Sequence, residues 1–127
     1  MCARILVIDD NPANLELMSY LLRCSGHEVL VATDGQAGLE LAQVEALELI
    51  ICDIQMPRMT GFEVVLHLKA NDHLMHIPLV AITAFAMVGD RERVLTGGFD
   101  GYMAKPIDPE VFVAQIEAFL VDSSKRG

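Results

Sequence analysis

Short apolar runs recur along this chain, separated by longer stretches in which apolar and polar residues mix. Most of these runs consist mainly of Ile, Val, Leu and Ala, a pattern typical of strands in a buried parallel sheet. We therefore expect five strands, at Arg4–Ile8, Glu28–Ala32, Leu49–Cys52, Ile77–Ile82 and Gly101–Ala104.

The stretches between the runs carry helix signals. Capping residues and prolines mark the expected starts, and glycines mark the ends. The starts are expected at Asn11-Pro12, after Asp34-Gly35, at the capping box Thr60–Glu63, at Asp90 and at Asp108-Pro109, with stops at Gly26 and Gly97-Gly98. Five strand–helix units predict an α/β fold with a doubly wound parallel sheet and right-handed crossovers. We expect one domain over residues 1–122 and a polar tail over 123–127.

Polar residues whose side chains can react or bind metal directly follow the apolar runs. Asp9 and Asp10 follow the first run, and Asp53 follows the third. Thr83 follows the fourth run and Lys105 the fifth. Open α/β sheets bind ligands at the carboxyl ends of their strands, so these five residues should share one crevice. Three carboxylates, a hydroxyl and an ammonium are the groups needed to move a phosphoryl group with a divalent cation.

The composition bears on the cellular compartment and on the class of binding partner. No apolar stretch approaches the roughly 20 residues of a membrane span, and the N-terminus is too short for a signal peptide. Three cysteines without C-x-x-C spacing suit a reducing compartment, so we expect a cytoplasmic protein. The net charge of −9 argues against direct nucleic-acid binding.

The predicted crevice calls for a metal ion. Three carboxylates facing one lysine would repel each other in a partly dry site, so a hard cation is the natural counter-charge. Oxygen ligands without a nearby Cys or His pattern favour Mg2+ over Zn2+. Asp53 is the expected nucleophile, because a carboxylate can take a phosphoryl group as an acyl phosphate.

Several segments together resemble the receiver domain of two-component response regulators, in the CheY-like superfamily. They are Asp9-Asp10-Asn11, Asp53-Ile-Gln-Met-Pro-Arg-Met-Thr-Gly61, Thr83-Ala84 and Lys105-Pro106. The resemblance implies a flavodoxin-like fold with strand order 2-1-3-4-5. The sequence resembles both free-standing receivers of the DivK type and receivers fused to hybrid histidine kinases.

The resemblance also implies roles for the metal ligands. Asp10, Asp53 and the backbone carbonyl of Gln55 would bind Mg2+ directly, and Asp9 would act through water. Asp53 would accept the phosphoryl group from a phosphohistidine on a histidine kinase or a histidine phosphotransfer protein. The chain would not be an enzyme beyond its own phosphotransfer and autodephosphorylation.

The phosphoryl group itself would meet four further residues. Lys105 would supply positive charge and Thr83 its hydroxyl, with the backbone amides of Ile54 and Ala84 as additional donors. The bond between Lys105 and the proline after it is cis in the family.

An aromatic switch is expected at Tyr102. In receivers, phosphorylation draws the residue matching Thr83 toward the phosphate, and the aromatic ring follows. The changed surface, formed by the fourth helix, fifth strand and last helix, would bind a downstream protein or a second copy of the chain. Candidate surface residues are Arg91, Val94, Leu95, Tyr102 and Phe112.

Three other functions compete with this interpretation. A haloacid-dehalogenase-type phosphohydrolase needs a second aspartate two residues after the nucleophile, where this chain has Gln55. A flavodoxin-like FMN protein needs a Ser/Thr/Gly-rich loop after the first strand, where Asp9 and Asp10 would repel the phosphate. A docking module that is never phosphorylated would be expected to lack at least one of the five site residues.

The bulky Phe85, two residues after Thr83, predicts slow loss of the phosphoryl group.

Overall fold

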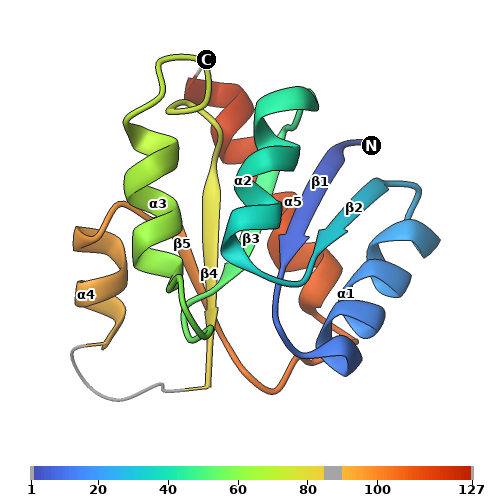
Figure 1. Ribbon diagram of the computed structural model, residues 1–127. Coiled ribbons are helices and arrows are strands. Elements are labelled where there is room, and N and C mark those ends of the chain that lie inside the picture. The colour runs from blue at the N-terminus through green and yellow to red at the C-terminus, as the bar shows by residue number, and fades with distance from the viewer. Residues whose placement is uncertain (1, 85–89, 127) are drawn as a thin grey trace.

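Strands and helices alternate in a computed structural model, which describes residues 2–84 and 90–126 (Figure 1). The strands are β1 (Arg4–Ile8), β2 (Glu28–Ala32), β3 (Leu49–Asp53), β4 (Leu79–Thr83) and β5 (Gly101–Ala104). The helices are α1 (Pro12–Cys24), α2 (Gly35–Val44), α3 (Gly61–Lys69), α4 (Asp90–Thr96) and α5 (Phe112–Arg126). The predicted alternation is confirmed.

The five strands form one parallel sheet in the order β2-β1-β3-β4-β5, as predicted. The register aligns the strand ends: Ile8 pairs with Cys52, and Thr83 pairs with Ala104. Residues that directly follow β1, β3, β4 and β5 therefore emerge at one edge of the sheet.

Each face of the sheet has its own core because successive strand side chains point to opposite faces. Leu6 and Ile8 lie in a core with buried residues of α2, α3 and α4, whereas Ile5 and Val7 lie in a core with those of α1 and α5. Helices thus cover both faces, with α1 and α5 on one side and α2, α3 and α4 on the other (Figure 1). This double cover explains why β3 and β4 are buried throughout.

Three helix starts follow the predicted caps. Asn11 accepts from the backbone amides of the first turn of α1, and Asp34 does the same for α2. Thr60 and Glu63 form the predicted capping box of α3.

Several boundaries differ from the predictions. β4 begins at Leu79 rather than Ile77, because Pro78 has no N–H and the Leu79 amide donates to the Asp100 side chain at 2.8 Å. α5 begins at Phe112, after a turn in which the Asp108 carbonyl accepts from the Phe112 amide at 3.0 Å. At its other end α5 runs to Arg126, so the polar residues 123–126 continue the helix.

Among the described residues, none of the helices has the length and apolar character to cross a membrane.

Candidate functional site

Asp9 is held in place by the junction between β1 and α1. Its backbone N–H donates to the Ala32 carbonyl at 3.1 Å, which extends the contact with β2. The Asn11 N–H donates to Asp9 Oδ1 at 2.9 Å. Asp9 is fully buried, whereas Asp10 is exposed. The same turn that starts α1 therefore fixes one carboxylate inside the crevice and leaves its neighbour open to solvent.

Asp53 is the last residue of β3 and only 3% exposed. Its Oδ1 atom accepts from the Gln55 N–H at 3.2 Å. Its Oδ2 atom lies 3.2 Å from Lys105 Nζ. Both oxygens of the expected phosphoacceptor thus have partners of positive character.

One predicted phosphoryl contact needs correction. The Ile54 N–H donates to the Ile82 carbonyl at 3.1 Å, because pairing between β3 and β4 continues beyond Asp53. The amide that points to the carboxylate of Asp53 belongs to Gln55. For Gln55 the family resemblance implied only a carbonyl role.

Lys105 reaches the crevice from the end of β5. Its Nζ atom lies 3.3 Å from Asp9 Oδ2 as well as 3.2 Å from Asp53 Oδ2. Its backbone N–H donates to the Thr83 carbonyl at 2.8 Å. The peptide bond between Lys105 and Pro106 is cis, as the resemblance implied.

The three aspartates form a compact acidic group. Oxygen atoms of Asp9, Asp10 and Asp53 all lie within 4.8 Å of one another. Lys105 offsets only one of the three charges. The buried Asp9 Oδ2 accepts no hydrogen bond among the described residues, although the ammonium lies nearby. An all-oxygen set with surplus negative charge and an unused buried lone pair fits a hard divalent cation such as Mg2+.

The electrostatics of the group show in two pKa shifts. Burial raises the pKa of Asp53 to about 6, with the charge of Asp9 acting in the same direction and the Gln55 amide and Lys105 opposing it. Burial lowers the pKa of Lys105, but the carboxylates of Asp53 and Asp9 outweigh this effect and raise it overall. The lysine therefore stays charged, and the aspartate lacks sufficient counter-charge.

The remaining predicted site residues lie on the neighbouring strands. Thr83 is the buried last residue of β4, and Ala84 follows it at the surface. Tyr102 lies on β5 opposite Ala81 and is half-buried. Phe85 lies outside the described residues.

The predicted output surface is only partly exposed. Leu95 is 40% exposed, whereas Val94 and Phe112 are 2% and 0% exposed. The prediction that Val94 and Phe112 lie on the surface is wrong, because both pack into the cores beneath α4 and α5. The side chain of Arg91 lies outside the described part of the structure.

The fold and the acidic site together define the chain as a receiver-type α/β protein, and it belongs to the response regulator receiver domain family. The profile of this family matches residues 5–117. Its members belong to two-component signalling systems, and they bind Mg2+ at an acidic aspartate cluster of this kind.

Two curated relatives with similar sequences are polar-differentiation response regulators. The chain is 40% identical over 119 residues to the polar-differentiation response regulator DivK of Brucella anthropi, covering 94% of this chain and 97% of that one. It is 39% identical over 123 residues to DivK of Brucella ovis, covering 97% and 100%.

Solved structures agree with the fold. The chemotaxis response regulator CheY4 of Vibrio cholerae matches with a TM-score of 0.88 at 28% identity, covering 94% of this chain and 99% of that one. The receiver domain of the sensor histidine kinase PA1611 from Pseudomonas aeruginosa matches with a TM-score of 0.86 at 27% identity, covering 95% and 99%. That receiver was solved with a magnesium ion coordinated in its active-site cleft.

Proposed function

We propose that this protein accepts a phosphoryl group on Asp53 from a phosphohistidine, in a Mg2+-dependent reaction, and passes the signal to a protein partner. The observation that carries the proposal is the position of Lys105 Nζ, 3.2 Å from Asp53 Oδ2 and 3.3 Å from Asp9 Oδ2. A buried carboxylate between a cation and a surplus of acids suits phosphoryl transfer better than it suits a purely structural role.

The transfer step uses the groups that surround the Asp53 carboxylate. A carboxylate oxygen of Asp53 forms a bond to phosphorus while the bond from phosphorus to the histidine nitrogen breaks, and the imidazole leaves with the electron pair. Negative charge on the transferring oxygens meets the Lys105 ammonium, the Thr83 hydroxyl and the amides of Gln55 and Ala84. The Gln55 amide and Lys105 already lie beside the Asp53 carboxylate, so these two groups need little rearrangement during the step.

Mg2+ would neutralise charge between the acids and the phosphoryl oxygens. Asp10, Asp53 and the carbonyl of Gln55 would hold it directly, with Asp9 acting through water. At neutral pH the raised pKa of Asp53 still leaves the carboxylate mostly ionised, so a cation has a charged ligand to bind.

The signal would leave through Thr83 and Tyr102. Movement of the Thr83 hydroxyl toward a phosphoryl group would open space beside β5, which the half-buried Tyr102 ring would enter. The altered surface of α4, β5 and α5 would then bind a downstream protein or a second copy of the chain. A cytoplasmic location, no direct nucleic-acid contact and no enzymatic turnover of outside substrates complete the proposal.

Intact mass spectrometry tests the chemistry. The protein is incubated with acetyl phosphate, with and without Mg2+, as wild type, Asp53→Asn and the matched control Asp108→Asn, which changes an exposed acid outside the site. We expect one added phosphoryl mass in wild type and in the control, only when Mg2+ is present, and none in Asp53→Asn. A lack of adduct in wild type would contradict the proposal and favour a docking module that works without phosphorylation.

A further inference from the structure

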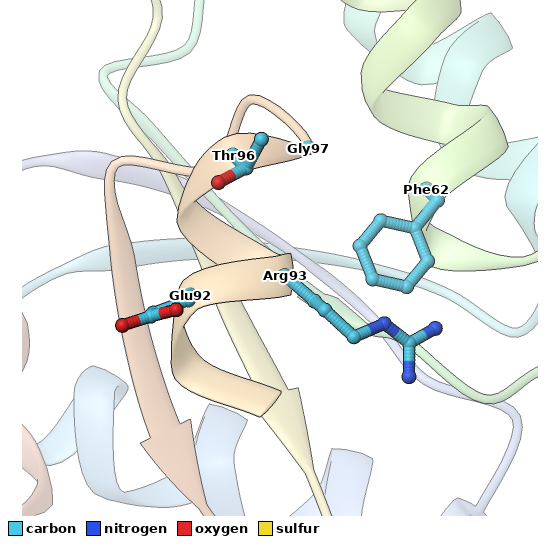
Figure 2. Close-up of a pocket in the computed structure, with 5 residues that line it drawn as sticks. All are labelled: Phe62, Glu92, Arg93, Thr96 and Gly97. Carbon is cyan, nitrogen blue, oxygen red and sulfur yellow. The ribbon is translucent and has the colours of Figure 1, made fainter. Parts of the chain in front are cut away.

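Phe62, the second residue of α3, lies at the contact between α3 and α4. Its ring packs edge-to-face against Phe99, with the ring centroids 6.1 Å apart and the planes at 74°. The guanidinium carbon of Arg93 lies 6.0 Å from the Phe62 ring centroid, which is within cation–π range. Figure 2 shows the Arg93 side chain extending from α4 toward this ring, whereas Glu92 points away from it. One aromatic ring therefore contacts both α4 and the segment that leads from α4 into β5.

Gly97 lets the ring come this close. A Cβ atom at Gly97 would lie 2.8 Å from Cδ1 of Phe62, closer than side-chain carbons pack. Around this contact is a surface groove of about 480 Å³, lined by Phe62, Glu92, Arg93, Thr96 and Gly97 (Figure 2). The space beside the ring leaves room for α4 to change its position against α3.

The residue before Phe62 touches the backbone that carries the phosphoacceptor. The Gly61 N–H donates to the Ile54 carbonyl at 2.9 Å. A Cβ atom at Gly61 would lie 2.7 Å from the carbonyl oxygen of Asp53 and 2.8 Å from Cα of Ile54. Because the first turn of α3 rests directly on this backbone, a displacement of Asp53 and Ile54 carries the start of α3 with it.

We propose that Phe62 is a positioning residue that transmits a change at Asp53 to α4, by a route separate from the one through Thr83 and Tyr102. The inference rests on the proposed function, since it requires Asp53 to take the phosphoryl group. The route runs from Asp53 through the Gly61 backbone to the Phe62 ring, and from there to Arg93. A single exposed cation–π contact is weak enough to break and re-form as α4 moves, whereas the packing of Gly61 on Asp53 is not.

The test measures amide chemical shifts of isotope-labelled protein before and after saturation with Mg2+ and beryllium fluoride, which forms a stable phosphoryl-like adduct on aspartate. In wild type we expect shift changes at the Val94 and Leu95 amides of α4 and at Thr83 and Tyr102. In Phe62→Leu and Arg93→Ala the changes in α4 should fall at least about twofold, with those at Thr83 and Tyr102 retained.

Two matched controls lie beside the altered residues. Leu66→Ala removes a side chain that is 67% exposed, one turn further along α3. Glu92→Ala removes the neighbour of Arg93 that points away from the Phe62 ring (Figure 2). Both controls should respond as wild type does, because neither side chain joins the ring to α4.

The intact mass of every variant is measured after treatment with acetyl phosphate and Mg2+, so that two kinds of failure are distinguished. A phosphoryl adduct together with undiminished α4 shift changes in Phe62→Leu and Arg93→Ala would overturn the Phe62 route and leave the proposed function intact. No adduct in wild type would overturn both. If Phe62→Leu does not fold, Arg93→Ala decides the matter alone, because the Arg93 side chain is exposed.

Discussion

Lys105 Nζ and Asp53 Oδ2 lie 3.2 Å apart although 52 residues separate them in the chain. Asp53 ends β3 and Lys105 follows β5, with β4 between the two strands. Two strand spacings amount to about 10 Å, so only a long side chain can make this contact. The lysine therefore crosses the end of β4, where Thr83 lies, and this crossing assembles the three residues into one site.

Replacing Lys105 should slow phosphorylation and leave the fold intact. Lys105→Met keeps the length of the side chain but removes the charge that would meet the transferring oxygens. We expect the rate of phosphorylation by acetyl phosphate to fall by about 100-fold, in line with the loss of one electrostatic contact to a transition state. Lys69→Met is the control, since Lys69 forms its ion pair with Asp100 instead. Equal rates in Lys105→Met and wild type, measured by mass spectrometry, would remove Lys105 from the mechanism.

The contribution of Asp53 to the stability of the metal-free protein should fall as the pH rises from about 4 to about 6. The pKa of Asp53 is raised from 3.8 to about 6 in the folded state, so the folded protein binds the proton more tightly than the unfolded chain does. Its stabilising contribution is complete below pH 4 and is lost as the pH rises through 6. A shift of this size corresponds to about 3 kcal/mol, and screening by water in the open crevice lowers the expected loss to about 2 kcal/mol. The measurement is urea unfolding in EDTA across this range.

Asp53→Asn is the informative comparison for that pH series. The variant has no titrating group at this position, so the difference in unfolding free energy between it and wild type should change across the window. Carboxylates distant from Asp53 titrate alike in both proteins and cancel. A difference that stays constant from pH 4 to pH 7 would show that Asp53 has an ordinary pKa.

Added Mg2+ should stabilise the protein at neutral pH by an amount that depends on Asp10. At about one hundred times the dissociation constant, a ligand that binds only the folded state stabilises it by about 3 kcal/mol. Asp10→Asn should weaken the Mg2+-dependent rise in melting temperature, whereas Asp108→Asn should not. A rise of equal size in Asp10→Asn and wild type, followed by thermal unfolding over a Mg2+ titration, would place the cation elsewhere.

The sequence predicted the strand order through the family resemblance, and it predicted the gathering of acids and Lys105 from where the apolar runs stop. These predictions succeeded because buried parallel strands leave a strong pattern and because their carboxyl ends share one edge. The role of the Ile54 amide was predicted wrongly because this amide donates one further β-ladder hydrogen bond, to the Ile82 carbonyl. The pattern of apolar residues does not show at which residue the ladder ends.

The surface residues show a similar limit. Val94 and Phe112 were expected on the output surface, but helix orientation turns both inward. Helical periodicity predicts an apolar face, yet which apolar residues lie at its edge depends on how the helix docks. The contact between Phe62 and Arg93 was not predicted for the same reason, since the two residues lie on separate helices.

His27 is a buried polar residue, and its contacts support a last prediction. Its side chain is fully buried, and Nδ1 accepts the Ala3 N–H at 3.0 Å. The ring proton therefore lies on Nε2, which donates to Glu117 Oε2 at 2.8 Å. The ring thus joins the start of β1 to α5.

Replacing His27 with Phe keeps much of the volume but leaves the Ala3 N–H without its acceptor. We expect the free energy of unfolding to fall by about 1–3 kcal/mol, the cost of an unsatisfied buried donor. Glu117→Gln should cost less, because the side-chain oxygen still accepts from Nε2 and the residue is partly exposed. Urea unfolding at neutral pH compares the two variants with wild type. If His27→Phe proves as stable as wild type, the bond to Ala3 contributes little, and the position needs only an aromatic ring to fill it.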